Sequence, residues 1–324
     1  MVRARRYLVA LVIIWISITT MLLVSLVVML AFLLNTTNSQ IPKLNRVSEM
    51  PTKTIETTGT PKDNEFTASK NIRLPQLEEN GRKVENYLAQ EGIESTTGIY
   101  FIDLNNERLV YSFNEEKRFY PASTYKLPLA MLVLKSSEKG QIDLNKKVYH
   151  ERRTGQASNR TLREILELMI KESDNDSMGI FEQELGGYEA SQELMEGEFG
   201  VRIERRTQIT TPETANKVLK VLYNDRYLSE QNKNYLIDLM RSVDEQFRDR
   251  LIAAAEEINL EYNKDLVAAS KIGNLTGKYH DTGIIYGQNS DYALSIFTTD
   301  RQTHAQAAEQ IRKITKILLQ GLEY

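Results

Sequence analysis

Residues 119–130 read FYPASTYKLPLA, and this stretch joins a serine and a lysine to the start of a long apolar run. Ser123 and Lys126 stand three residues apart, so on a helix they share one face. Pro121 suits a helix start, and the apolar run 127–134 predicts that the helix is buried. Unpaired N–H groups at a helix start can hold a developing oxyanion. Lys126 can accept the serine proton if burial or a neighbouring charge keeps its amine partly neutral.

The Ser-x-x-Lys pattern alone does not decide the function, because the chain contains a second copy at Ser136 and Lys139. That copy lies at the polar end of the same predicted helix, just before Gly140, which is typical of a helix C-cap. A structural role for either copy therefore stays open until the rest of the chain is considered.

Composition excludes several functional classes. The 324 residues include 26% charged and 41% hydrophobic side chains, a normal globular mixture, with a net charge of −3. No basic run is present, so we expect no nucleic-acid partner. The chain has no cysteine, which excludes disulfides and thiolate chemistry. His150, His280 and His304 lack metal-ligand spacing, so we expect neither a metal nor another cofactor, although a serine–histidine triad remains open.

A long uncharged segment lies near the N-terminus. Residues 7–34 carry no charge over 28 positions, enough to span a bilayer. Arg3, Arg5 and Arg6 precede the segment, and no charge follows it until Lys43. The positive-inside rule then places the N-terminus in the cytoplasm and the rest of the chain outside. The apolar run is longer than a cleaved signal peptide needs and lacks a small-x-small site, which favours an uncleaved anchor.

The flanking segments complete the expected domain organisation. Residues 1–6 form a cytoplasmic tail, and residues 7–34 form a single-pass anchor in the cell membrane. Residues 35–77 are rich in Thr, Asn, Ser, Lys and Pro, which predicts an extracytoplasmic linker. Residues 78–324 then form one folded extracytoplasmic domain.

Within this domain, hydrophobic periodicity predicts strands near both ends and helices between them. Thr161 and Glu164 form a capping box, and Thr211 with Pro212 starts another helix. The predicted helices cover residues 77–88, 127–134, 161–171, 177–185, 190–195, 211–223, 230–241, 246–258 and 303–319, and the predicted strands cover 98–104, 108–113, 266–271, 282–286 and 292–298.

This order predicts an α/β (α+β) fold. An antiparallel sheet would be built from both chain ends, flanked by helices, with an inserted all-helical lobe. A cleft between the sheet and the lobe would be the natural place for a site.

Two further motifs join the Ser-x-x-Lys pattern. Ser173-Asp174-Asn175 follows a predicted helix, and Lys271-Ile272-Gly273 ends a predicted strand. In this order, the three motifs resemble those of the serine β-lactamase and penicillin-binding protein superfamily, S-x-x-K, S-D-N and K-T-G. Residues 271–287, which contain His280-Asp281, resemble the branch related to class A β-lactamases. The resemblance covers roughly residues 80–324.

The resemblance implies a role for each matching residue. Ser123 would be the nucleophile, Lys126 its activating base, and Ser173 the hydroxyl that passes a proton to the leaving nitrogen.

It also implies substrate-binding roles. Asn175 would hold a side-chain carbonyl of the substrate, and Lys271 would bind its carboxylate and keep Lys126 closer to neutral by repulsion. The backbone N–H groups of Ser123 and Asn274 would form the oxyanion hole, and Gly273 would let the substrate approach.

Two departures from the family pattern bear on activity. Ile272 stands where the family usually has Thr or Ser, which should weaken binding of carboxylate-bearing substrates by about 1–3 kcal/mol. Class A enzymes also carry an E-x-x-L-N glutamate that activates the deacylating water. No such motif occurs between Asn175 and Lys271, and the surroundings of Glu204 do not match it.

Two functions therefore remain as hypotheses. The first is a membrane-anchored serine hydrolase of β-lactamase or D,D-peptidase type, which acts on β-lactam or peptidoglycan-like amides through a slowly released acyl-enzyme. The second is a β-lactamase-like domain with weak or absent catalysis that binds cell-wall material or a protein partner.

The expected topology can be tested by proteolysis. Protease added to intact cells stripped of their wall should cut within residues 35–77 and release the domain, because this segment is expected to be extracytoplasmic and unable to order itself. Immunoblotting against the C-terminus measures the release, with a cytoplasmic protein as the control for lysis. A domain cut only after permeabilisation would contradict the topology.

Overall fold

The computed structural model describes residues 74–199, 209–224, 226–301 and 303–322, all of which belong to the compact unit of residues 67–324. The predicted tail, anchor and most of the linker lie outside the described residues. None of the described helices combines the length and the apolar character needed to cross a membrane.

Strands from both ends of the chain form one five-stranded sheet, as the sequence predicts. Its order is β2-β1-β7-β6-β5, and every neighbouring pair is antiparallel. The strands are β1 (Thr97–Asp103), β2 (Arg108–Phe113), β5 (Val267–Leu275), β6 (Lys278–Tyr286) and β7 (Tyr292–Thr298). The α/β class with an antiparallel sheet flanked by helices is therefore confirmed.

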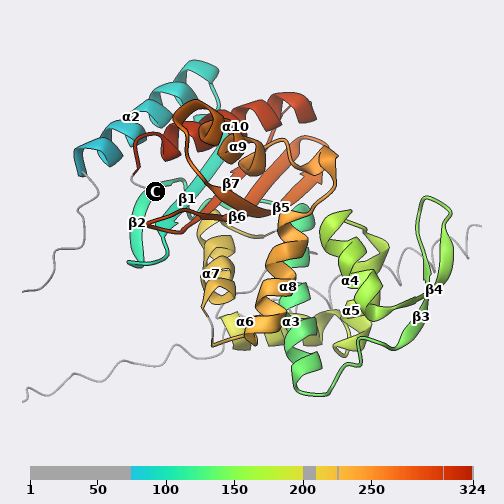
Figure 1. Cartoon of the computed structure of the whole chain (residues 1–324). Coiled ribbons are helices and arrows are strands. Elements are labelled where there is room, and N and C mark those ends of the chain that lie inside the picture. Colours follow the sequence, from blue (N-terminus) through green and yellow to red (C-terminus); the bar gives the residue numbers. More distant parts are fainter. Residues whose placement is uncertain (1–73, 200–208, 225, 302, 323–324) are drawn as a thin grey trace, which may run out of the picture. The chain divides into compact units, whose positions relative to one another are not determined.

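Alternation along the strands divides the core in two. In β1, Ile99 and Phe101 join one hydrophobic cluster, whereas Ile102 joins the other, as expected when successive side chains point to opposite faces. The first cluster packs under three helices, which cover one face of the sheet in Figure 1: α2 (Leu74–Glu91), α9 (Leu251–Tyr262) and α10 (His304–Leu319).

The second cluster joins the opposite face of the sheet to a helical lobe (Figure 1). At its centre lies α3 (Lys126–Glu138), whose residues are buried without interruption from Lys126 to Leu134. The surrounding helices are α4 (Leu162–Lys171), α5 (Asp176–Glu184), α6 (Tyr188–Phe199), α7 (Pro212–Tyr223) and α8 (Glu230–Arg241). Elsewhere in the described chain, short 3-10 turns are η1 (Glu94–Thr96), η2 (Ala122–Tyr125) and η3 (Glu245–Phe247).

Local signals in the sequence place several helix ends correctly. Thr161 caps α4 in a capping box with Glu164, and both reciprocal hydrogen bonds are present. Thr211 caps α7, with Pro212 in its first turn. Gly140 follows α3 at a φ of +71°, the left-handed conformation expected of a glycine C-cap.

The prediction of an all-helical lobe is wrong. A two-stranded hairpin, β3 (Lys147–Glu151) and β4 (Ala157–Thr161), lies in the lobe beside α4 and α5 (Figure 1). Its strands are mostly polar and exposed, so they lack the apolar alternation by which the other strands were recognised.

Several predicted boundaries also change. The first described helix begins at Leu74, inside the predicted linker. Strand β5 continues to Leu275, because β6 begins at Lys278 and pairs with it, so the Lys271 motif lies within a strand. The predicted helix 246–258 is replaced by η3 and then α9.

The close pairing of β5 and β6 makes Gly283 a sensitive position. A Cβ there would lie 2.5 Å from the backbone oxygen of Ala269, which cannot move without disturbing β5. We expect Gly283→Ala to lower the free energy of unfolding by about 1–3 kcal/mol. Gly179→Ala, in α5, is the matched control: its Cβ meets no atom of the described residues within 4 Å, so it should raise the free energy of unfolding by about 0.5–1 kcal/mol. Urea denaturation measures both, and equal stabilities would contradict the packing argument.

Candidate active site

Ser123 lies in η2, the 3-10 turn that leads directly into α3. Ala122 just before it adopts a φ of +47°. The carbonyl of Pro121 accepts hydrogen bonds from the backbone N–H (3.2 Å) and the hydroxyl (2.6 Å) of Thr124. Ser123 itself is half-buried, so its hydroxyl stands in a fixed turn that solvent can still reach.

The sheet holds this turn through His280 on β6. The Nε2 of His280 donates to the carbonyl oxygen of Tyr120 at 2.7 Å, while its Nδ1 accepts from the backbone N–H of Thr298 at 3.2 Å. Burial lowers the pKa of His280 to about 3, so the ring is neutral. Both ring nitrogens are occupied by backbone groups, so His280 positions the turn and is not available as a base.

The structure gives Gly273 a different role from the one expected. A Cβ at this position would lie 3.1 Å from each of Pro121 O, Thr124 Cγ2 and His280 Cδ2. The space is thus filled by η2 and β6 rather than left open to a substrate. Gly273 lets β5 pack closely against the turn that carries Ser123.

Lys126 is the centre of the predicted site. Its side chain is fully buried, and its Nζ lies 3.0 Å from Ser123 Oγ, 3.3 Å from Ser173 Oγ and 2.8 Å from Asn175 Oδ1. It also donates to the backbone carbonyl of Ser173. One amine therefore contacts the predicted nucleophile and both polar residues of the second motif.

Lys271 reaches the same place from β5. Its Nζ lies 2.9 Å from Ser173 Oγ and 3.2 Å from the carbonyl oxygen of Ile272, and the side chain is 1% exposed. The hydroxyl of Ser173 thus lies between two buried lysine amines. Neither amine forms a salt bridge with any part of the chain that the structure describes.

Burial determines the protonation of this pair. It lowers the pKa of Lys126 to about 7, while the negative charges of Asp174 and Asp176 oppose the shift. Burial also lowers the pKa of Lys271 well below its usual value, and the charge of Lys126 adds to this effect. The expectation that Lys271 is what keeps Lys126 near neutral therefore needs correction, because burial is the main cause.

Ile272 and Asn274 point away from Ser123. Along β5, Lys271 and Gly273 face the lobe and η2, so the two alternate residues belong to the opposite face. There Asn274 Oδ1 accepts from Arg250 Nη2 at 2.6 Å, and Ile272 is 3% exposed. Ile272 is therefore a packed side chain with little surface open to a ligand.

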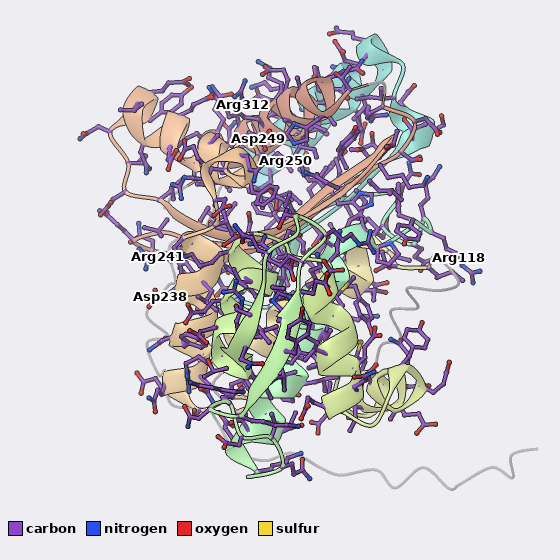
Figure 2. All side chains as sticks on the ribbon, turned by 90° about the vertical axis from the view of Figure 1, so that its right-hand side faces the viewer. Arg118, Asp238, Arg241, Asp249, Arg250 and Arg312 are labelled. Atoms are coloured by element: carbon purple, nitrogen blue, oxygen red, sulfur yellow. The ribbon has the colours of Figure 1, made fainter. Side chains whose placement is uncertain are left out.

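Arg250 was not identified from the sequence. It lies at the start of α9 beside Asp249 (Figure 2), is fully buried, and also donates to the carbonyl of His280 on β6 at 2.7 Å. Because a guanidinium can only donate, it fixes which end of the Asn274 amide faces it. Burial raises the pKa of the neighbouring Asp281 to about 6, against the opposing charge of Arg250. The only signal in the sequence is the apolar stretch 251–255, which directly follows Arg250.

Three features complete the picture of the site. Residues 200–208, which contain Glu204, lie outside the described residues. No group of three His, Asp or Glu residues within the described segments is placed to hold a metal ion. The backbone N–H groups of Ser123 and Asn274 remain the predicted oxyanion hole.

Two open cavities lie away from this cluster. They measure about 530 Å³ and about 500 Å³, and both are lined by Asp238 and Arg241 of α8 (Figure 2) and by Val267. None of the predicted site residues lines them. The chemistry of the lysine pair, rather than cavity size, therefore identifies the candidate site.

Comparison with known proteins bears on the family and the fold. The family model described as "Beta-lactamase enzyme family" matches residues 80–322. No sequence among curated proteins matches the chain.

Solved structures share the fold at low identity. A structure described as PBP-A matches with a TM-score of 0.64 and 20% identity, over 75% of this chain and 95% of that one. A class A β-lactamase from Bacteroides cellulosilyticus gives 0.63 and 20%, over 78% and 99%. A β-lactamase from Chitinophaga pinensis gives 0.63 and 22%, over 74% and 97%. At these identities the likeness shows the fold alone.

The ionisation of Lys126 should be visible in a pH profile. A lysine base acts in its neutral form, so the rate of acylation of Ser123 should rise with pH through about 7 and then level off. Asp176 raises the pKa of Lys126 and Arg153 lowers it. Asp176→Asn should therefore move the midpoint to lower pH, and Arg153→Ala should move it to higher pH.

Stopped-flow acylation by a chromogenic β-lactam measures these midpoints. Arg312→Ala is the control, because it removes a positive charge, as Arg153→Ala does, but from α10 (Figure 2). It should leave the midpoint unchanged. A midpoint that stays fixed in both site variants would contradict the assignment of Lys126 as the base.

Proposed function

Because this chain belongs to the β-lactamase enzyme family, we propose that it is a serine hydrolase that cleaves amides through an acyl-enzyme on Ser123. Its substrate would be a β-lactam or a peptidoglycan-like peptide, so the activity would be of β-lactamase or D,D-peptidase type. One observation carries this proposal: the Nζ of a buried lysine with a pKa of about 7 lies 3.0 Å from Ser123 Oγ.

The geometry supports a complete acylation step. Ser123 Oγ attacks the substrate carbonyl carbon, and its proton passes to the neutral amine of Lys126. The oxyanion that forms is held by the backbone N–H groups of Ser123 and Asn274. When the carbon–nitrogen bond breaks, the leaving nitrogen takes a proton from Ser173 Oγ, which regains one from the adjacent lysine amines. The product is an ester on Ser123 and an amine, which departs from a peptide substrate and stays attached to the acyl group when the substrate is a β-lactam.

Binding roles follow from the same contacts. In this proposal the Nζ of Lys271, which now contacts Ser173, would pair with a substrate carboxylate, and this pairing would restore the charge that burial disfavours. Asn175 is exposed although its Oδ1 contacts Lys126, so its amide nitrogen is available to a substrate carbonyl.

Release of the acyl group is the slow step in this proposal. Hydrolysis of the ester needs a base that activates a water molecule, and the sequence lacks the E-x-x-L-N glutamate of class A enzymes. No carboxylate in the described segments takes part in the contacts around Ser123 and Lys126. Lys126 would therefore have to serve a second time as the base.

We also propose that the enzyme is anchored in the cell membrane and faces the cell wall. The support is the uncharged segment 7–34, the arginines before it and the polar stretch 35–73 after it. A wall-facing domain on such a linker would meet peptidoglycan-like amides directly.

A binding module is the second candidate function. It is favoured by the absence of a hydroxyl at position 272, where the family usually has Thr or Ser, because the Ile272 side chain instead packs on the face of β5 that points away from Ser123. It is opposed by the two buried amines, because burying such groups without a use costs free energy. The two candidates differ in one outcome, the formation of a covalent bond to Ser123.

Mass spectrometry of the intact protein tests the proposed function. Incubation with a reactive β-lactam should add the mass of one ligand and leave a long-lived adduct, because acylation is supported and deacylation is not. Ser123→Ala should abolish the adduct, and Lys126→Met should slow its formation at least about 100-fold. Ser136→Ala, in the second Ser-x-x-Lys copy at the end of α3, is the matched control and should react normally.

Two results would contradict the proposal in different ways. Rapid turnover without an adduct would reveal a deacylating base and remove the slow step. No adduct and no turnover with any β-lactam or wall peptide would favour the binding module.

A further inference from the structure

The β3–β4 hairpin contacts the second motif from the side opposite the lysines. In the segment 172–176, the carboxylates at Glu172, Asp174 and Asp176 alternate with Ser173 and Asn175. The side chain of Ser173 contacts the amines of Lys126 and Lys271, and the side chain of Asn175 contacts the amine of Lys126. The three carboxylates all turn to side chains of the hairpin, which divides the segment into a catalytic side and a hairpin side.

Asp174 is the most constrained of the three. Its Oδ2 accepts from His150 Nε2 at 3.0 Å and from the backbone N–H of Ser177 at 3.0 Å, and it also accepts from the Ser177 hydroxyl at 2.5 Å. Its Oδ1 accepts from Arg152 Nε at 3.2 Å. Two of these four donors belong to the hairpin, and the carboxylate is almost completely buried.

The outer carboxylates are held by the same loop. Arg152 Nη2 lies 2.7 Å from Glu172 Oε2. The backbone N–H and the Nε of Arg153 donate to the two oxygens of Asp176 at 2.9 and 3.3 Å. The hairpin therefore holds the segment at three successive points.

Ser173 needs such support because of its backbone. Its φ is +54°, a left-handed conformation that is uncommon for residues other than glycine. A residue of this kind keeps its conformation only when its surroundings impose it. The conformation matters, because it turns both the carbonyl and the hydroxyl of Ser173 toward Lys126.

His150 points to a specific purpose for the hairpin. Its imidazole is 1% exposed, yet its Nδ1 has no hydrogen-bond partner among the described residues, so the buried ring forms one side-chain hydrogen bond there, through Nε2 to Asp174. Leaving a buried polar atom unpaired costs free energy. An apolar side chain would fill the same space without that cost but could not donate to Asp174.

We propose that the β3–β4 hairpin is a positioning element of the active site, in which His150, Arg152 and Arg153 hold the segment 172–176 so that Ser173 and Asn175 face Lys126. These three residues touch neither the nucleophile nor its base, and they act through the backbone of the second motif. The catalytic consequence rests on the proposed acylation of Ser123, whereas the positioning itself does not.

The test compares two substitutions of one residue in the full chain. His150→Gln keeps a side-chain N–H that can reach Asp174, and His150→Leu keeps the volume without a donor. Tyr149→Ala, on the exposed face of the same strand, is the matched control. Hydrogen–deuterium exchange of residues 172–178 reports the positioning. Stopped-flow kinetics with a chromogenic β-lactam separates the binding constant from the acylation rate.

In His150→Leu we expect faster exchange in residues 172–178, with exchange in α9 and α10 unchanged. Acylation should slow about tenfold, the effect of one lost hydrogen bond, with little change in the binding constant. His150→Gln should restore both properties, and Tyr149→Ala should match the parent chain. If His150→Leu does not fold, Arg152→Met removes a different donor to Asp174 and should give the same pattern.

The other outcomes separate the positioning role from the proposed function. Unchanged exchange in His150→Leu, or a His150→Gln chain as impaired as His150→Leu, would overturn the positioning role. A parent chain that forms no adduct would overturn the proposed function, and exchange would then decide the positioning role alone. Normal acylation in a chain whose exchange is faster would show that the segment is held by the hairpin but that catalysis does not depend on it, which overturns the proposal.

Discussion

The site depends on one electrostatic constraint: two lysine amines are buried around a single hydroxyl, and no carboxylate of the described residues contacts either amine. Burying an ammonium ion is costly, so the protein lowers the pKa of both amines instead of pairing them. Within the described residues, Lys126 and Lys271 meet only hydroxyl, amide and carbonyl groups. A neutral amine beside a serine can accept the proton of the serine hydroxyl. A buried amine without a carboxylate partner can bind an anionic group of a substrate.

Meeting this constraint requires three separate parts of the chain to converge. The turn that carries Ser123 is fixed to the sheet by His280 and by the close approach at Gly273. Strand β5 brings Lys271 from one face and Asn274 from the other, and Arg250 fixes the orientation of the Asn274 amide. The helical lobe contributes the segment 172–176. A displacement of any of the three would separate the amines from the hydroxyl between them.

The sequence predicted the parts of this arrangement that depend on local patterns. Spacing and periodicity within a few residues predict the cap at Thr161, the start of α7 and the strands near both ends of the chain that form the sheet. The three motifs identified the residues that meet at Lys126, although they did not show how close these residues would lie. Resemblance to a known family, rather than periodicity, linked motifs that are nearly 150 residues apart in the sequence.

What the sequence could not predict depends on tertiary contacts. The β3–β4 hairpin has a polar, exposed pattern, so nothing in its sequence distinguishes it from a loop. Arg250 and His150 are ionisable residues that would normally be assigned to the surface, and only the folded chain shows their buried partners. The role of Gly273 depends on the packing of β5 against η2. The sequence of the motif does not predict which residues lie beside the glycine.

The pairing of β1 with β7 has a consequence for biosynthesis. Thr97 pairs with Thr298, so about 200 residues must be made before the central strands of the sheet can meet. Contacts this distant in sequence form late, after local helical contacts. The helical lobe can therefore gather around α3 while the strand that completes the sheet is still missing. Ser123 is therefore synthesised long before the strand that carries Lys271, so the contact of both lysines with Ser173 can form only after β5 has been added to the sheet.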